Sequence, residues 1–299
     1  MYHLPVLLNE SIGLLDIHPE GLYADLTYGG GGHSKAILEK LTTGRLVAFD
    51  QDEDAEMNKI VDDRFIFVPQ NFRYLSNFLK FYKMYPLDGI LVDLGVSSYQ
   101  IDEPGKGFSH MTSDADLDMR MSKKLTKTAA DVLNSYSEKE LSDLFFQFSE
   151  LHYSRKIASS IVTLRNEKSF KKTSDLTGLI DRFVSPNHRF SNYSRVFQAL
   201  RIEVNEEMVV LKEMLMQTLD VLKPGGILVV ISYHSAEDRI VKNFMKFGNM
   251  KGVPEKDFYG HITKYFEPIT KKPIVPGEEE LFRNNRARSA KLRASRRVV

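Results

Sequence analysis

The chain of 299 residues contains no cysteine. This absence excludes disulfide bridges, metal sites built on thiolates and any cysteine nucleophile. Long apolar runs are missing as well, because no stretch reaches the roughly 18 consecutive apolar residues that a membrane span requires. The first residues, interrupted by Asn9, Glu10, Asp16 and Glu20, lack the pattern of a signal peptide. We therefore expect a soluble, cytoplasmic protein without a membrane partner.

An excess of charge of one sign is also missing. The chain has 41 Lys and Arg residues against 40 Asp and Glu residues, so its net charge of +1 does not by itself point to nucleic acid. The exception is the C-terminal segment 283–297, which has seven basic residues and no acid. This segment is either a solvated tail or an edge strand with one basic face, which would suit phosphate groups.

Apolar runs and helical periodicity together predict an α/β domain. Residues 21–26, 45–49, 65–68 and 89–92 are expected to be strands, with a helix at 34–41. The pattern resumes with an amphipathic helix at 206–222, a turn at 223–226 and a buried strand at 227–231. Strands that alternate with helices favour a mainly parallel, Rossmann-like sheet.

Residues 104–205 carry helical periodicity instead of strand patterns. Helices are expected at 138–148, 154–165, 176–184 and 193–204, with Ser137 and Ser174 at N-cap positions. We therefore predict an all-helical domain at 104–205, which recognises the substrate, inserted into an α/β domain made of residues 1–103 and 206–299.

The segment 25–34, Asp-Leu-Thr-Tyr-Gly-Gly-Gly-Gly-His-Ser, follows the first strand and precedes a helix. Its glycines let the backbone approach a ligand closely, and free N–H groups at the helix start favour polar or anionic parts of that ligand. Asp50 ends the second strand, where a carboxylate can bind both hydroxyls of an adenosine ribose. The glycine spacing fits S-adenosylmethionine better than a dinucleotide, although an NAD-dependent oxidoreductase remains an alternative.

Two further polar clusters follow strands. Asp93 begins the segment 93–100 at the carboxyl edge of the sheet, where it can pair with the ammonium group of the methionine part of the cofactor. The segment 232–239 follows the strand that ends at residue 231. Its His234, Glu237 and Asp238 lack metal-ligand spacing, so we expect no metal. We interpret this second cluster as a cleft wall, a substrate contact or a helix cap.

Taken together, these segments resemble the RsmH (MraW) family of bacterial 16S rRNA cytosine-N4 methyltransferases. The resemblance runs along almost the whole chain and is carried by residues 3–8, 31–34, 93–98, 107–109, 117–121, 197–201, 234–239 and 286–289. Tyr99, Ala115-Asp116 and Asn285 depart from the family pattern and affect local loop shape.

The resemblance implies a class I S-adenosylmethionine-dependent methyltransferase fold. It implies that the substrate is a cytidine in the decoding region of 16S rRNA, presented by the small (30S) ribosomal subunit to a monomeric or homodimeric enzyme. Carried over by position, the cofactor contacts are Gly31, Gly32, His33, Asp50, Phe72, Asp93 and Gln100.

Direct in-line transfer from a sulfonium needs no covalent intermediate. Methylation at cytosine C5 normally uses a cysteine that adds to the ring, so a chain without cysteine leaves transfer to an exocyclic nitrogen or to a ribose oxygen open. Asp93, Ser97, Ser98 and a backbone carbonyl remain open as acceptors of the amino proton. A non-catalytic protein that binds RNA or assists ribosome assembly is the second alternative.

Basic residues are the expected RNA contacts. The first set is Arg120, Arg201, His234, Arg286, Arg288 and Arg293, and the helical domain adds Lys123, Lys124, Arg155, Arg189 and Arg195. In a different interpretation, Asp118 and Arg120 order the loop that joins the inserted domain to the cleft.

Overall fold

The computed structural model describes residues 5–111, 114–255, 258–260 and 263–299, apart from the side chains of Ser98 and Pro104. Backbone contacts divide the chain into two compact units. Unit 1 comprises Met1–Gly95 and Val209–Val299, and unit 2 comprises Val96–Met208. Unit 2 therefore begins eight residues before the position placed at 104 from the sequence. The difference arises because the chain leaves the sheet directly after its fourth strand, and a short helix, α4 (Ser98–Asp102), follows there.

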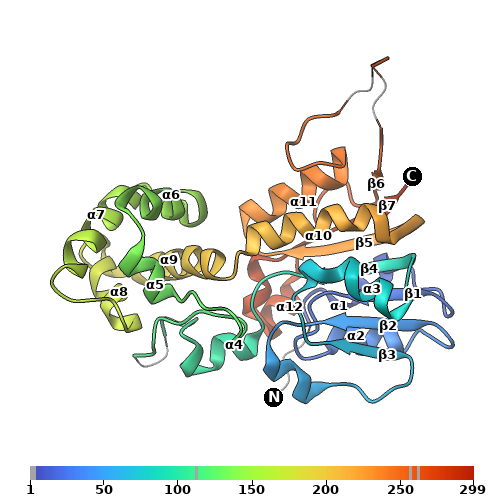
Figure 1. Ribbon diagram of the computed structural model, residues 1–299, viewed down its shortest axis with the longest axis horizontal. Coiled ribbons are helices and arrows are strands. Elements are labelled where there is room, and N and C mark those ends of the chain that lie inside the picture. The colour runs from blue at the N-terminus through green and yellow to red at the C-terminus, as the bar shows by residue number, and fades with distance from the viewer. Residues whose placement is uncertain (1–4, 112–113, 256–257, 261–262) are drawn as a thin grey trace. The chain divides into compact units, whose positions relative to one another are not determined.

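Within the described residues, unit 1 is built on a seven-stranded sheet in the order β3-β2-β1-β4-β5-β7-β6 (Figure 1). The strands are β1 (Leu22–Asp25), β2 (Arg45–Phe49), β3 (Phe65–Val68), β4 (Leu87–Asp93), β5 (Leu222–Ser232), β6 (Phe266–Pro268) and β7 (Lys291–Arg297). β1 to β5 are parallel, whereas β7 is antiparallel to both β5 and β6. The predicted α/β class with a mainly parallel sheet is confirmed.

Both faces of this sheet are apolar and both are covered by helices (Figure 1). Along β2, Val47 and Phe49 pack into one core, and Leu46 and Ala48 into the other, as the alternation of side chains in a strand requires. The first face is covered by α3 (Leu75–Tyr82), α10 (Glu207–Val221) and α11 (Ser235–Phe247), and the second by α1 (Leu8–Leu15) and α2 (Gly32–Leu38). None of the helices in the described part of the chain is long and apolar enough to cross a membrane.

The C-terminal half of unit 1 differs from the sequence-based prediction. β5 begins at Leu222, which pairs with Leu87 before the strand bulges through the predicted turn, and Ile227 then pairs with Gly89. β7 is not an edge strand, because it lies between β5 and β6. The edge-strand and the solvated-tail interpretations are therefore both wrong for residues 291–297, whose pairing partners are distant in sequence.

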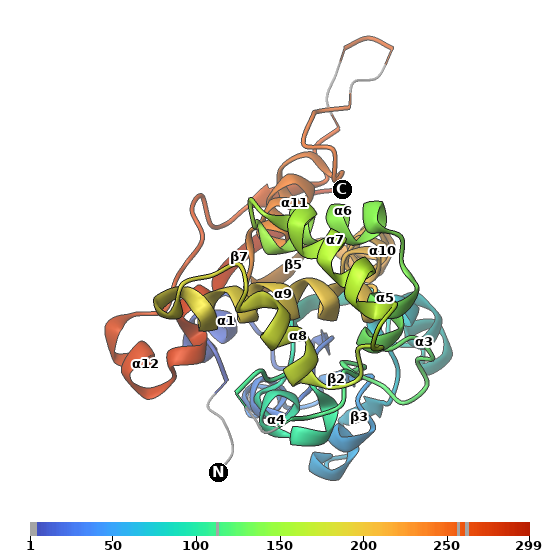
Figure 2. The same cartoon turned by 90° about the vertical axis from the view of Figure 1, so that its left-hand side faces the viewer.

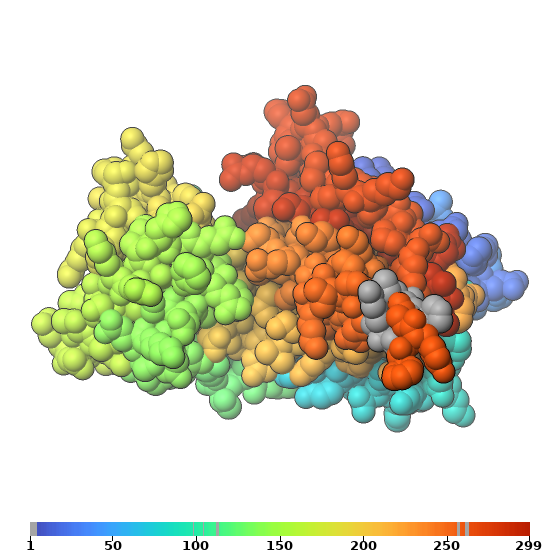
Figure 3. Space-filling view, turned by 90° about the horizontal axis from the view of Figure 1, so that it is seen from above, coloured from blue at the N-terminus to red at the C-terminus, as the bar shows by residue number. Residues whose placement is uncertain are grey.

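A short helix, α12 (Glu278–Arg283), and a 3₁₀ helix, η5 (Asn285–Ser289), precede β7. The segment around α12 projects from the rest of unit 1 in Figure 2. The space-filling view in Figure 3 shows the red C-terminal part of the chain projecting in the same way. Side chains on this segment are thus accessible over most of its outer surface.

Unit 2 is helical among its described residues. Its main helices are α5 (Ala129–Ser135), α6 (Glu138–Ser149), α7 (Ser154–Arg165), α8 (Thr173–Ile180) and α9 (Arg189–Val204). Ser137 caps α6 as predicted, with its hydroxyl accepting the Glu140 N–H at 3.2 Å. The predicted cap at Ser174 is wrong, because α8 begins one residue earlier and the Asp175 carboxylate accepts the Lys172 N–H at 2.9 Å.

Unit 1 also contains two 3₁₀ helices, η1 (Glu53–Asn58) and η2 (Phe72–Tyr74), and unit 2 contains η3 (Pro104–Lys106) and η4 (Pro186–His188). η2 follows β3 directly and therefore lies at the same end of the sheet as the polar segments that follow β1, β2 and β4. That end is where the predicted cofactor residues of unit 1 gather.

Candidate active site in unit 1

The strand order of unit 1 reverses between β1 and β4. From β1 the chain adds β2 and then β3 on one side, and β4 and β5 follow on the other. Open α/β sheets bind ligands at the carboxyl ends of the strands beside such a reversal. Here the two strand ends are joined, because the backbone N–H of Asp93 donates to the Thr27 hydroxyl at 2.7 Å. The glycine-rich loop and the strand-end carboxylates are gathered at this point.

The glycine-rich loop, residues 27–31, connects β1 to α2 and is fixed to the end of β2. The Tyr28 N–H donates to the Phe49 carbonyl at 2.8 Å, and the Gly29 N–H donates to Asp50 Oδ2 at 2.7 Å. Gly31 has φ of +77°, and a Cβ there would lie 2.7 Å from the Tyr28 hydroxyl. A side chain at Gly31 would therefore be strained and would collide with the Tyr28 ring, so this turn of the loop requires glycine.

Asp50 holds the loop with one carboxylate oxygen and its own turn with the other. Oδ1 accepts the Asp52 N–H at 2.9 Å, and Oδ2 accepts the Gly29 N–H. Burial raises the pKa of Asp50 to about 6, although these two hydrogen bonds lower it. A carboxylate has roughly four lone-pair positions, so two hydroxyl donors can still be accommodated. The arrangement fits the two hydroxyls of a ribose.

Asp93 ends β4 and is held from the neighbouring strand. The Tyr233 hydroxyl donates to Asp93 Oδ1 at 2.8 Å. Burial raises the pKa of Asp93 to about 6, while the nearby His33 and the Tyr233 phenol lower it. Burial, and then the Asp93 charge, raises the pKa of Tyr233 far above its ordinary value, so the phenol stays protonated and remains a donor. Tyr233 was not among the predicted site residues, although its place directly after β5 puts it beside the end of β4.

A third carboxylate, Asp25 at the end of β1, is fully buried. It accepts hydrogen bonds from the Ser34 hydroxyl at 2.6 Å and from the Thr27 N–H at 3.1 Å. Burial raises its pKa to about 6. Three strand-end carboxylates with raised pKa values concentrate poorly solvated negative charge at this end of the sheet. Such a site fits a cofactor that carries positive charge, as S-adenosylmethionine does on its sulfonium and ammonium groups.

The side chain of His33 contacts the N-terminal segment of the chain. Its ring is 4% exposed, and Nε2 lies 3.1 Å from the Val6 carbonyl oxygen. Burial lowers its pKa. The Leu7 N–H in turn donates to Glu280 Oε1 at 2.7 Å. The imidazole therefore holds the N-terminal segment, and a cofactor contact by His33 would come from its backbone at the start of α2.

The remaining predicted cofactor residues lie in both units. Phe72 begins η2 and packs partly buried against the sheet core. In unit 2, Ser97 and Gln100 form a capping box on α4: the Ser97 hydroxyl accepts the Gln100 N–H at 3.2 Å, and Gln100 Oε1 accepts the Ser97 N–H at 3.0 Å. The side chain of Ser98 lies outside the described residues.

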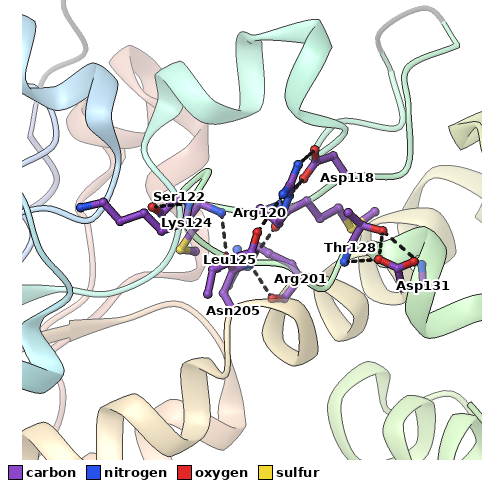
Figure 4. Close-up of polar contacts among 11 residues, drawn as sticks. Asp118, Arg120, Ser122, Lys124, Leu125, Thr128, Asp131, Arg201 and Asn205 are labelled. Atoms are coloured by element: carbon purple, nitrogen blue, oxygen red, sulfur yellow. Dashed lines mark hydrogen bonds and ion pairs between the residues drawn. The ribbon is translucent and has the colours of Figure 1, made fainter.

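Arg120 and Arg201, two of the predicted RNA contacts, make internal ion pairs within unit 2. Figure 4 shows the contacts of Arg120 with Asp118 and with Leu125. Arg120 binds both oxygens of Asp118, at 2.7 and 2.8 Å, and donates to the Leu125 carbonyl at 2.7 Å. Arg201 binds both oxygens of Glu207, at 2.8 and 2.9 Å. The interpretation in which Asp118 and Arg120 order a loop is the one that these contacts favour.

Two further predicted RNA contacts also have internal partners, this time in unit 1. Arg293 is 8% exposed, and its guanidinium binds Asp238 at 2.7 and 3.2 Å. The Arg293 guanidinium thus makes a buried ion pair in the folded chain, and its phosphate contact stays a prediction. His234 caps α11, with Nδ1 accepting the Glu237 N–H at 3.4 Å, so the helix-cap interpretation of this cluster holds. Arg286 and Arg288 lie exposed on η5.

No group of three His, Asp or Glu side chains in the described ranges is arranged to hold a metal ion. The groups gathered at the strand ends of unit 1 are three carboxylates, the Tyr233 phenol and the glycine-rich backbone. A doubly covered α/β sheet with these groups at its strand reversal defines a protein that binds a nucleoside cofactor.

Comparison with known proteins gives the family. The model of the MraW methylase family matches residues 1–298, and the chain belongs to this family. It is 52% identical over 294 residues to the ribosomal RNA small subunit methyltransferase H of Phocaeicola vulgatus, covering 98% of this chain and 96% of the relative. The protein of the same name from Bacteroides thetaiotaomicron is 51% identical over 293 residues, again covering 98% and 96%. A solved rRNA methylase from Streptococcus thermophilus is similar over 97% of this chain and 93% of its own, at 11% identity and a TM-score of 0.42.

Proposed function

We propose that this chain transfers a methyl group from S-adenosylmethionine to the N4 amino group of a cytidine in the decoding region of 16S rRNA. The observation that carries the proposal is the cluster of Asp25, Asp50 and Asp93 around the glycine-rich loop at the strand reversal. Membership of a methylase family favours methyl transfer over the oxidoreductase alternative. The names of the curated relatives support small-subunit rRNA as the substrate.

The cofactor of this methyltransferase is S-adenosylmethionine, whose sulfonium supplies a methyl group that needs no further activation. Asp50 would accept the ribose hydroxyls, and the backbone of residues 29–33 would lie against the rest of the nucleoside. Phe72 would lie against the adenine ring. The negative charge of Asp93 would attract the ammonium group of the cofactor. Burial of Asp93 would weaken the screening of this attraction by water.

Among the three side chains considered as acceptors of the amino proton, we assign that role to Asp93. A carboxylate with a pKa of about 6 is largely ionised at neutral pH and can act as a proton acceptor, whereas a serine hydroxyl such as that of Ser97 is far too weak a base. Methyl transfer to N4 would release one of the amino protons, which Asp93 would accept, and the electrons of the C–S bond would stay on sulfur. The Tyr233 hydrogen bond fixes Asp93 Oδ1, so the other oxygen, Oδ2, is the one that would receive the proton.

Unit 2 and the exposed basic residues of unit 1 would bind the RNA. A base inside a stack would have to leave it to reach the carboxyl end of β4, at a cost of a few kcal/mol that backbone contacts must offset. The absence of cysteine suits an exocyclic amino group, because such a group needs no covalent adduct to the ring.

The test is methyl transfer from labelled S-adenosylmethionine to unmodified small ribosomal subunits, followed by digestion of the rRNA and identification of the labelled nucleoside. The expected product is N4-methylated cytidine at one position in the decoding region. Label on another nucleoside would show that the substrate is not this cytidine. Cofactor binding without transfer to any form of the rRNA would favour the non-catalytic alternative, in which the chain only binds RNA.

A further inference from the structure

The segment 278–290, which holds α12 and η5, combines an exposed aromatic ring with exposed arginines. The ring of Phe282 is 92% exposed, one of the highest values for a large apolar side chain in the described residues. Arg283, Arg286 and Arg288 are exposed as well. A single exposed phenylalanine is common on protein surfaces, but its position within seven residues of three exposed guanidinium groups is a specific combination.

This segment is anchored firmly to unit 1. Ala287 and Ala290 are 0% and 1% exposed, and Leu281 packs against the same core. The Leu7 N–H donates to Glu280 Oε1 at 2.7 Å, which ties α12 to the N-terminal segment that borders the glycine-rich loop. The backbone at Phe282 is therefore already ordered. Binding of a ligand to the ring costs the protein little conformational entropy.

The segment has three glutamates and three arginines, and all of its arginines follow its acids in the sequence. Two of the three acids of α12 are engaged, Glu280 with the Leu7 N–H and Glu279 in an ion pair with Arg283. From residue 281 onward no acid follows. Arg288 makes no ion pair with any residue that the structure describes, in contrast to the buried Arg293. Its charge is thus available to a ligand from outside the chain.

We propose that Phe282 and Arg288 form a binding site for an unpaired nucleotide of RNA, with the base stacked on the phenyl ring and the phosphate bound by the guanidinium. An aromatic ring beside arginine is how proteins hold unstacked bases, whereas a site for duplex phosphates alone has no use for an exposed ring. This inference rests on the proposed function in taking rRNA as the ligand. The inference adds a second RNA-binding site, separate from the cofactor site. This site would bind the RNA strand next to the nucleotide to be methylated or further along the strand.

The first experiment measures binding of the full-length protein to a fluorescently labelled single-stranded oligoadenylate and to an RNA duplex of equal length. Phe282→Ala should weaken binding of the single strand at least about fivefold and leave duplex binding unchanged, because one base–aromatic stack is lost. Phe282→Trp should retain the affinity, whereas Phe282→Leu should lose it, since leucine is apolar but offers no ring face. Phe81→Ala is the matched control, because Phe81 is 75% exposed on α3. Equal affinities of wild type and Phe282→Ala for the single strand would overturn the site.

The salt dependence of binding tests Arg288 separately. Arg288→Gln should reduce the slope of log K against log salt by about 0.7, the value for one phosphate contact to a single strand, and Phe282→Ala should leave the slope unchanged. An unchanged slope for Arg288→Gln would remove the phosphate contact from the proposal.

Methylation assays separate this inference from the proposed function. With small ribosomal subunits as substrate, Phe282→Ala should raise the KM for the RNA about fivefold or more without changing the KM for S-adenosylmethionine. If the wild type does not methylate rRNA but its RNA binding depends on Phe282, the proposed function fails and the site stands. If the wild type methylates rRNA and Phe282→Ala changes neither RNA binding nor KM, the site fails alone.

Discussion

Replacing Asp93 with asparagine should make the cofactor-free protein more stable at neutral pH. Burial raises the pKa of Asp93 from its ordinary value of 3.8 to about 6 in the folded protein. A group whose pKa is raised on folding binds its proton more tightly in the folded state. The folded state is therefore penalised once both states are ionised, above about pH 6, and the penalty disappears below the unfolded value. Asparagine is uncharged, keeps the size of the side chain and can still accept the Tyr233 hydroxyl.

The magnitude follows from the pKa difference. About two pKa units correspond to roughly 3 kcal/mol. Because Asp93 is partly exposed to solvent, we reduce this to about 1–2 kcal/mol. The melting temperature should rise by a few degrees at pH 7.5. Urea unfolding and thermal melts without cofactor, repeated between pH 4 and pH 8, measure the effect, and the advantage of Asp93→Asn should shrink as the pH falls from 6 to 4.

Asp62→Asn is the control with the opposite sign. Asp62 receives hydrogen bonds from the Arg64 guanidinium, which hold its pKa down at about 2. This ion pair stabilises the folded state above the ordinary pKa of the carboxyl, so its loss should not raise stability at pH 7.5. The reasoning is refuted if Asp93→Asn is less stable than the wild type at pH 7.5, or if its advantage is the same at pH 4 as at pH 8.

Three further predictions concern the same unit. Asp50→Ala should weaken S-adenosylmethionine binding at least about tenfold in calorimetry, because two charge-assisted hydrogen bonds are lost; unchanged affinity would exclude the ribose contact. Wild-type affinity for S-adenosylmethionine should fall as the pH drops below about 6, because protonation of Asp50 and Asp93 would remove the charges that we propose as cofactor contacts; a flat profile from pH 5 to 8 would contradict this. Arg293→Ala should lower the free energy of unfolding by roughly 3 kcal/mol, because Asp238 loses its partner in a buried pair; a change in RNA affinity with unchanged stability would instead support the phosphate contact.

Local sequence patterns were sufficient for the first four strands and for two of the three carboxylates in the site. Strands β2 and β3 lie where their apolar runs predict, because a strand covered on both faces needs uninterrupted apolar residues. Asp50 and Asp93 were predicted from their positions at strand ends, and the carboxyl ends of parallel strands necessarily meet at one edge of a sheet. Asp25 was included in the glycine motif without a separate role.

Pairings between distant segments could not be predicted in this way. Tyr233 and Asp93 are 140 positions apart, and Leu7 and Glu280 are 273 positions apart. No periodicity within either segment specifies its partner. The alternation of basic residues around Arg293 indicates an exposed face, and only the folded chain shows that Asp238 lies opposite.

The order of the strands in the sheet has a consequence for the synthesis of this protein. β4 lies between β1 and β5, but the ribosome makes all of unit 2 after β4 and before β5. Until β5 emerges, the nascent β4 has an unpaired edge, and such non-local pairing is slow and prone to aggregation. Tyr233 and Glu280 are made later still, and so is the strand β7 that pairs with β5. A nascent chain can therefore complete this site only after the residues that follow unit 2, Tyr233 among them, have been made.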